Sequence, residues 1–462
     1  MKHFTLIVFA LGLNLFCFAQ SENKNTPCAD VVLFDPANAN KGNTPSVNTA
    51  SFVEIGSPAS MGGYPSITDI VTFGGKMYLA TSANPLAAFG TNVFYTTDGV
   101  NYTKVLDDAT SQGYLRIRVI DSKLWIPDGD PNGYDPSFVY ISSTGAPSSF
   151  TQTQIIQAVH SFDVAKYNNQ FYVSNGMLSG SGGLCLYDGS STWNQVYTDA
   201  NSVRMKYMAT FNNMLFVANR NSSSDVDCYV FSGDPATTTP TQVNALSGAT
   251  NTFRMYTTTL NGKLFWSVAA GSNINVLMTI DGVNWQPCTT LAGRIVSDFC
   301  ELNGKLYAIA TDGLWESSDY FTFTNIAAPP TSDPNAFIPA VVGPGVNPDS
   351  PASLEAYNGY IWCGSARNGK VYQVNVATSA PELSNNDLQY ELTDHSVIFN
   401  LENTATVGLQ VYSLIGTEVK NISAGTLSKG KHEINLQDLQ QGVYLLQAQI
   451  GDQLQGIKFV KQ

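Results

Sequence analysis

Hydrophobic and polar residues alternate along most of the chain, and short polar turns interrupt the alternation at regular intervals. One such turn is Leu302–Tyr307, in which a hydrophobic residue, Asn-Gly, one variable position and a hydrophobic-aromatic pair follow one another. Asn and Gly tolerate positive φ at both central positions, as a tight hairpin between twisted strands requires. Similar segments begin at residues 73, 120, 167, 211, 260, 302 and 357, so their spacing ranges from 42 (302 − 260) to 55 (357 − 302) residues. Such a period is typical of β-propeller blades.

Each repeat has the alternation expected of four strands. In the first complete repeat the predicted strands are Ile67–Phe73, Met77–Ala80, Val93–Thr96 and Tyr102–Leu106. The last repeat ends after its third strand, and the segment 52–55 resembles the missing fourth strand. Pairing of the two ends would leave no free sheet edge. We therefore expect an all-β fold in which residues 51–376 form a seven-bladed β-propeller closed by the N-terminal strand. Six or eight blades is the alternative.

Asp-Gly pairs followed by an aromatic residue recur between the third and fourth predicted strands. They are Asp98-Gly99 with Tyr102, Asp188-Gly189 with Trp193, and Asp281-Gly282 with Trp285, and Asp319 with Phe323 is a looser copy. In shortened form these segments resemble the Asp-box of sialidase-like propellers. The resemblance implies that the Asp caps a turn, the Gly adopts positive φ and the ring packs between sheets. Because such boxes are structural in that family, they support the fold and carry no catalytic role.

The C-terminal part of the chain has a different pattern. A polar linker at 377–386 precedes short alternating strands over 387–462, which are typical of a small, Ig-like β-sandwich. The segments 411–419, 439–446 and 458–461 closely resemble the type A C-terminal sorting domain of the type IX secretion system, with Gly416, Gly442, Tyr444 and Lys458 as motif residues. The resemblance implies that the type IX machinery delivers the chain to the outer surface, or the outside, of a Gram-negative bacterium. A fibronectin-like accessory module is the alternative.

The N-terminus has the pattern of a secretory signal. A basic start at Lys2 and His3 precedes a hydrophobic segment, and Ala19 is suited to cleavage, so we predict a signal peptide at 1–19 and an extended leader at 20–50. We expect no transmembrane segment in the mature chain, because no other stretch approaches ~20 apolar residues. A net charge of −13 disfavours nucleic acid as a partner. We expect a monomer.

The cysteines do not form a recognisable framework. Six remain after the signal peptide: Cys28, Cys185, Cys228, Cys288, Cys300 and Cys363. They show no CxxC motif or regular spacing, and a chain of this size does not need disulfides to hold its core. We expect buried free thiols, with a Cys288–Cys300 bridge as the alternative.

Charged and aromatic residues gather on the predicted inner strands. Five arginines, including Arg118, lie in or just before these strands, and Asp or Tyr often stands four positions before a turn. Since inner strands line the central channel, such side chains suit a ligand with carboxylate, sulfate or hydroxyl groups. The candidate ligand-binding residues are Arg116, Arg204, Arg254, Arg294, Asp69, Asp163, Asp298 and Tyr256. The alternative is that Arg–Asp pairs link neighbouring blades.

One loop matches the beginning of a calcium-binding motif. Its candidate ligands are Asp128, Asp130, Asn132 and Asp135, whose alternating oxygens suit Ca²⁺. However, Val139 stands where an EF-hand has its bidentate Glu, so an ordinary turn between strands is the alternative.

The sequence therefore supports two functions. The first is an exported binding or adhesion module whose ligand is a glycan or a protein. The second is a glycan-active enzyme, a sialidase-like hydrolase or a lyase, on the top face of the propeller. No assembled catalytic set is recognisable, and fold alone does not decide between the two.

Overall fold

The chain is built from strands. The computed structural model describes residues 50–83, 90–111, 113–129, 136–155, 158, 160–177, 181–200, 202–221, 226–243, 249–270, 273–339, 352–374, 376, 390–392, 396–401, 404–413, 418–450 and 453–461. Apart from two 3₁₀ turns, η1 (Pro58–Met61) and η2 (Thr289–Leu291), every regular element in these ranges is a β-strand. The chain divides into two compact units, one ending at Val376 and the other beginning at Ala377. The predicted signal peptide, leader and linker fall almost wholly outside the described residues.

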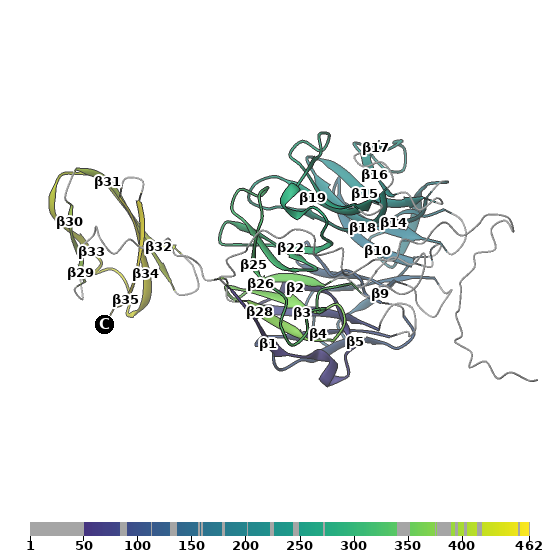
Figure 1. Cartoon of the computed structure of the whole chain (residues 1–462), viewed down its shortest axis with the longest axis horizontal. Helices are drawn as coiled ribbons and strands as arrows, with labels where there is room; N and C mark the ends of the chain where they lie inside the picture. Colours follow the sequence, from purple (N-terminus) through teal and green to yellow (C-terminus); the bar gives the residue numbers. More distant parts are fainter. Residues whose placement is uncertain are drawn as a thin grey trace, which may run out of the picture. The chain divides into compact units, whose positions relative to one another are not determined.

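The first unit consists of antiparallel strand groups that follow one another along the chain (Figure 1). Group 1 contains β2 (Ser66–Phe73), β3 (Lys76–Ser82), β4 (Thr91–Thr96) and β5 (Thr103–Asp108). Group 2 contains β6 (Arg118–Ile120), β7 (Lys123–Pro127), β8 (Phe138–Ser142) and β9 (Thr151–Ile155). Group 3 contains β10 (His160–Tyr167), β11 (Gln170–Gly176), β12 (Gly183–Tyr187) and β13 (Thr192–Thr198). In each group, consecutive strands pair.

The remaining groups repeat this arrangement. Group 4 contains β14 (Ser202–Phe211), β15 (Met214–Asn221), β16 (Val226–Phe231) and β17 (Thr241–Val243). Group 5 contains β18 (Ala249–Thr257), β19 (Leu264–Ala270), β20 (Asn273–Thr279) and β21 (Gln286–Pro287). Group 6 contains β22 (Val296–Leu302), β23 (Lys305–Ala310), β24 (Gly313–Ser317) and β25 (Thr324–Ala327). Group 7 contains β26 (Ser353–Tyr357), β27 (Tyr360–Gly364) and β28 (Val371–Val374), together with β1 (Phe52–Gly56) from the other end of the unit.

Strand β1 lies beside β28, which is more than 300 residues later in the sequence. The two strands pair antiparallel, with Phe52 opposite Val374 and Glu54 opposite Tyr372, and Figure 1 shows β1 in purple beside β28 in green. The ammonium of Lys370 and the carboxylate of Glu54 add an ion pair of 2.8 Å at this edge. The N-terminal strand therefore supplies the fourth strand of group 7.

The first strands of the groups contact one another in sequence order. Contacts run from β2 through β6, β10, β14, β18, β22 and β26, and from β26 back to β2. Hydrophobic clusters lie between successive groups. Group 1 shares one cluster with group 2 and another, around Ile67 and Trp362, with group 7. Because one face of each sheet packs on the next, the core is divided among these interfaces.

Most of the predicted tight turns are present. Positive φ at both central residues occurs at 74–75, 121–122, 168–169, 212–213, 303–304 and 358–359. The prediction of a two-residue turn at Asn261-Gly262 is wrong. There the ladder of group 5 ends earlier, where the Thr258 N–H donates to the Lys263 carbonyl at 2.9 Å. The carboxylate of Glu301, from group 6, accepts the Thr259 N–H at 2.6 Å and so holds the longer loop.

The second unit contains two sheets. One has the order β29 (Tyr390–Leu392), β30 (Ser396–Leu401), β33 (Gly430–Asn435), and the other has the order β32 (Glu418–Leu427), β31 (Ala405–Ser413), β34 (Gly442–Ile450), β35 (Gln453–Lys461). Buried residues of both sheets, among them Phe399 and Val411, form one cluster. The alternation over 387–462 predicted short strands of this kind.

The five cysteines within the described residues are free and buried: Cys185, Cys228, Cys288, Cys300 and Cys363. This confirms the prediction of buried thiols at these positions and shows that the alternative of a Cys288–Cys300 bridge is wrong. Burial raises the pKa of the Cys185 thiol to about 12, so this side chain is a small hydrophobic group rather than a nucleophile.

Candidate functional site

Charged residues on the first strands share one local feature, a β-bulge. The ladder register shifts immediately before Asp69 in β2, Asp163 in β10, Arg254 in β18 and Asp298 in β22. A bulge places two residues of one strand opposite one residue of its partner and re-aims the following side chain. These four side chains therefore occupy equivalent positions in four different groups.

This equivalence corrects the alignment of the fifth repeat. Asp69 stands four residues before Phe73, where the ladder of its hairpin ends. In group 5 the hairpin ends at Thr258 rather than at the predicted position, so Arg254, and not Tyr256, stands at the matching place. Tyr256 is only half-buried, and its ring lies 5.8 Å from that of Phe299.

Arg254 connects two aspartates from different groups. Its Nε donates to Asp298 Oδ1 at 2.9 Å, and its Nη2 donates to Asp298 Oδ2 at 2.8 Å and to Asp69 Oδ1 at 2.9 Å. The Arg254 residue is fully buried. A bidentate pair with a second carboxylate is a strong arrangement for a charge removed from water. Because Asp298 belongs to group 6 and Asp69 to group 1, Arg254 links groups that are not neighbours in sequence.

A second pair of arginines meets Asp163. Arg118 donates from Nε and Nη2 to the two Asp163 oxygens, both at 2.6 Å, and from Nη2 to the Met208 carbonyl at 2.9 Å. Arg116 lies 3.8 Å from both Asp69 and Asp163, measured between charged atoms. Three arginines and three aspartates thus form one network, buried except for the partly exposed Arg118. We call it the central charge network, and its formal charges cancel.

Each aspartate of the central charge network also accepts a backbone N–H from the next group. Asp69 Oδ2 accepts the Ile117 N–H at 2.7 Å, and Asp163 Oδ2 accepts the Met208 N–H at 2.9 Å. Asp298 Oδ2 accepts the Leu354 N–H at 3.1 Å. The carboxylates therefore join neighbouring first strands.

The pKa shifts follow from burial among opposite charges. Burial raises the pKa of Asp163, but Arg118 and Arg116 outweigh burial and hold it below its ordinary value. Burial, with Arg118 and Arg254 nearby, lowers the pKa of Arg116 to about 10. Beside the network, burial raises the pKa of Glu355 to about 8, and its Oε1 accepts the Thr72 N–H at 3.0 Å.

The structure does not bring all the predicted arginines together. Arg294 pairs with Asp312 at 2.6 Å and lies over the ring of Trp315, within group 6. Arg204 is half-buried in β14, opposite Gly176 of β11. Arg118, which was not among the candidates, takes part in the central charge network instead.

The candidate calcium loop is only partly described, since Asp130, Asn132 and Asp135 lie outside the described residues. Asp128 is fully buried. Its carboxylate accepts the Ser111 hydroxyl, and its carbonyl accepts the Ser137 hydroxyl and, at 2.7 Å, the Ser161 hydroxyl. These contacts give Asp128 a structural role. In the described part of the chain, no group of three or more His, Cys, Asp or Glu residues could hold a metal ion.

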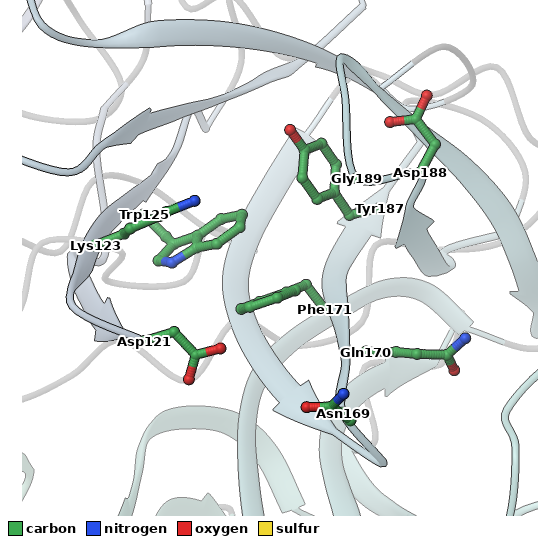
Figure 2. A pocket seen from close by; sticks show the side chains of 9 residues that line it. All are labelled: Asp121, Lys123, Trp125, Asn169, Gln170, Phe171, Tyr187, Asp188 and Gly189. Atoms are coloured by element: carbon green, nitrogen blue, oxygen red, sulfur yellow. The ribbon is translucent and has the colours of Figure 1, made fainter.

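An open cavity lies elsewhere, at the turns of groups 2 and 3 (Figure 2). Its volume is about 380 Å³. Trp125 and Phe171 stack with ring centroids 4.4 Å apart and planes at 21°, and Tyr187 meets Trp125 edge-on at 5.7 Å. The lining residues are Asp121, Lys123, Trp125, Asn169, Gln170, Phe171, Tyr187, Asp188 and Gly189. We call this space the aromatic cavity.

Sequence reasoning missed the aromatic cavity because its rings belong to the repeated hydrophobic-aromatic pairs, which look like core. One signal was available. The aromatic residue follows the Asp by four positions at Asp98 and Asp281 but by five at Asp188. The Asp188 carboxylate accordingly accepts N–H groups from Ser190, Ser191 and Thr192 at 2.8 to 3.1 Å, which stabilises a longer turn.

The sorting-motif residues are partly visible. Gly442 and Tyr444 lie in β34, where the Tyr444 hydroxyl donates to the Gln440 carbonyl at 2.9 Å. Lys458 lies opposite Leu445 in the ladder between β34 and β35. Gly416 lies outside the described residues.

A family model for the secretion system C-terminal sorting domain matches residues 395–462. This confirms the resemblance drawn from the motif residues. Such a type IX sorting domain directs its chain to the surface, or the outside, of Bacteroidetes-type Gram-negative bacteria. Within the described residues, no helix has the length and hydrophobicity needed to cross a membrane. No curated protein matches the chain.

Two solved structures are similar in fold. One is the extracellular domain of a protein described as a hybrid two-component system, BT4673, from B. thetaiotaomicron, with 12% identity and a TM-score of 0.47. The match covers 89% of this chain but only 58% of that structure. The other is the β-propeller domain of the Trilobed protease from Pyrococcus furiosus, with 8% identity, a TM-score of 0.42, and coverage of 68% of this chain and 96% of that one. At these identities the likeness concerns the fold alone.

Proposed function

We propose that the chain is an exported binding or adhesion module that holds a glycan or protein ligand at the bacterial surface. The observation that carries the proposal is the joining, in one chain, of a sorting domain and a larger all-β unit with an open aromatic cavity. Most known ligand pockets are concave, mostly apolar and lined by a few polar groups. The aromatic cavity combines three aromatic rings with five polar or charged side chains.

We infer that the first unit is a closed, seven-bladed β-propeller acting as a monomer. The pairing of β1 with β28 and the run of contacts from β2 to β26 and back support this architecture. The turns at Asp98 and Asp281 support the resemblance to shortened Asp-boxes, because each carboxylate accepts the backbone N–H groups two and three residues later. A closed ring would present its turns and loops as a rigid binding surface.

The alternative, a glycan-active enzyme, would place its substrate on the predicted arginines and aspartates. Arg254 is fully buried and engaged by Asp69 and Asp298, and Arg116 lies between two aspartates. A substrate carboxylate that took over the contacts of Arg254 with Asp69 or Asp298 would leave aspartates buried without a counter-charge, which is strongly unfavourable. This favours a stabilising role for the central charge network and a binding role for the chain.

Retention and turnover can be separated in one experiment. The labelled full chain is applied to arrays of bacterial and host glycans and surface proteins, and the solution is analysed by mass spectrometry for smaller sugars. We expect retention without release. Release of smaller sugars would favour the enzyme, and the absence of both retention and release would reject both functions.

Calcium at residues 128–135 stays a prediction. If the loop binds Ca²⁺, EDTA should weaken retention or lower the Tm of the full chain. Because Asp128 is already engaged by serine hydroxyls, we expect EDTA to change neither. A clear fall in Tm would support the calcium loop.

A further inference from the structure

The aromatic cavity exists because one turn does not close over the ring beneath it. In groups 7, 4 and 2, an aromatic residue ends the hairpin segment at Trp362, Phe216 and Trp125. The Asp-Gly turn of the next group covers the first two of these rings. A Cβ atom placed on Gly99 would overlap the Trp362 indole, and one placed on Gly282 would lie 2.8 Å from Phe216 Cζ.

At the third ring the contact is missing. Gly189 has the same kind of backbone conformation, with φ 83° against 76° at Gly99, but a Cβ atom placed on it would meet no atom within 4 Å. The longer turn from Asp188 to Trp193 lifts the glycine away from Trp125. Instead of glycine, Tyr187 stands beside the indole. The space between is the aromatic cavity, so its presence follows from the one-residue insertion.

We propose that the aromatic cavity binds a sugar ring of an uncharged glycan. The inference rests on the proposed binding function and names its site and ligand class. Phe171 and Tyr187 are half-buried and offer ring surface to a ligand, while Trp125, only 2% exposed, forms the floor. In Figure 2 the three rings face a common space, with Asp121 and Asn169 at its lower side. Aromatic faces pack on the C–H face of a pyranose, and polar groups at the edge meet its hydroxyls.

The polar groups at the edge suit hydroxyl groups. Gln170 Oε1 accepts the Tyr172 hydroxyl at 2.7 Å, so the amide nitrogen is the end of this side chain that can donate to a ligand. Asp121 is exposed and supplies carboxylate oxygens that accept hydrogen bonds. The Tyr187 hydroxyl donates to the Ser190 carbonyl at 2.8 Å and can still accept. Acceptors and donors therefore surround an apolar floor.

The charge balance favours a neutral sugar over an acidic one. Two aspartates and one lysine line the cavity, and Lys166 pairs with Asp121 at 2.6 Å. The formal charges of these four side chains cancel. The chain as a whole carries −13, which repels polyanions. The volume of about 380 Å³ lies within the range of roughly 300–1,000 Å³ that is usual for small-molecule sites.

The test measures binding of defined oligosaccharides to the full chain by isothermal titration calorimetry. The neutral probes are maltohexaose, cellohexaose, mannohexaose and chitohexaose, and the acidic probe is hexagalacturonate. We expect at least one neutral probe to bind and the acidic probe not to bind. Tyr187→Ala and Phe171→Ala should each weaken binding at least tenfold, whereas Tyr187→Phe should keep most of it because the ring remains.

Two further variants guard against effects on folding. Tyr360→Ala removes an exposed aromatic ring from the hairpin of group 7 and should leave affinity unchanged. Asp121→Asn changes an exposed side chain and should weaken binding a few-fold without altering Tm.

Neutral binding that persists in Tyr187→Ala and Phe171→Ala would overturn the cavity as the site but leave the binding function intact. Binding of the acidic probe alone would overturn the ligand class. If no probe binds while a surface protein is retained on the arrays, the sugar inference fails and the proposed function stands. If nothing at all is retained, both fail.

Discussion

The central charge network and the aromatic cavity are made from residues of the same repeats, yet they differ in how completely their groups are satisfied. In the network, Arg254 makes three charged hydrogen bonds to Asp298 and Asp69. In the cavity, the rings of Phe171 and Tyr187 keep exposed surface, and Gly189 has no neighbour where a side chain would stand. Residues that look functional in the sequence are therefore structural where they pair mainly with one another. A site is better sought where the packing of a repeat is incomplete.

The largest effect is expected when Arg254, the centre of the central charge network, is replaced. Arg254→Leu leaves Asp69 and Asp298 buried without their main counter-charge, and we expect a loss of about 3–5 kcal/mol in the free energy of unfolding. Urea denaturation of the full chain measures it. Lys305→Ala is the control, because it removes a more exposed pair with Glu316 and should cost at most about 1 kcal/mol. If both variants show the same small decrease in the free energy of unfolding, the network does not stabilise the fold.

The second prediction compares the closed and the open turn directly. Gly99→Ala and Gly189→Ala introduce similar backbone strain, since both residues have positive φ, and that strain costs about 1 kcal/mol in each. Gly99→Ala also forces a methyl group into the Trp362 ring, which we expect to add about 1–3 kcal/mol. Thermal denaturation should therefore show a clearly lower Tm for Gly99→Ala than for Gly189→Ala. Equal Tm values would contradict an open space at Gly189.

The third prediction concerns pH and the edge of the network. Burial raises the pKa of Glu355 from its ordinary 4.5 to about 8, so the folded state holds this proton more tightly than the unfolded state. The resulting stability is present below pH 4.5 and is lost as pH rises through 8. Glu355→Gln stays neutral and can still accept the Thr72 N–H. Near pH 4 we expect the variant and the natural chain to have the same free energy of unfolding. At pH 9 we expect the free energy of unfolding of the variant to be higher by on the order of 1–3 kcal/mol.

Urea denaturation of both chains at several pH values measures this difference. Parallel stability curves from pH 4 to pH 9 would show that Glu355 does not titrate in this way. The same measurement on Asp121→Asn serves as the control, because that carboxyl is exposed.

The smallest expected effect belongs to the cavity. Asp121→Asn removes the ion pair with Lys166, in which both side chains are partly exposed, so stability should change by less than about 1 kcal/mol. Its effect should appear in ligand affinity instead. A large fall in Tm would mean that the edge of the aromatic cavity is structural, like the central charge network.

Much of the fold could be predicted from local patterns. The turns at 74–75 and 303–304 have the positive φ that their residue types imply, and alternation located strands such as β2 and β3 correctly. The fifth hairpin could not be predicted in this way. Its length depends on Glu301, a residue of the next group that binds the backbone of the loop. The two-residue shift then hid the equivalence of Arg254 with Asp69, Asp163 and Asp298.

The candidate site was predicted only in part. Five of the eight candidate ligand-binding residues, Arg116, Arg254, Asp69, Asp163 and Asp298, meet in space, although the sequence could not tell pairing with one another from binding of a ligand. The sequence counted Arg118 on an inner strand but gave no reason to prefer it to Arg204 or Arg294. Arg118 is distinguished from these two arginines only in the tertiary structure, where it donates to Asp163 and to the Met208 carbonyl.

By itself, the sequence determined the strand period, the turn types and the sorting domain, because each depends on residues close together in the chain. The tertiary structure alone decided which charges neutralise one another and which ring stays uncovered. Ion pairing depends on distances between strands that are far apart in sequence, from Asp69 to Arg254 and Asp298. The aromatic cavity depends on whether the turn at Gly189 reaches Trp125, and one inserted residue is enough to keep them apart.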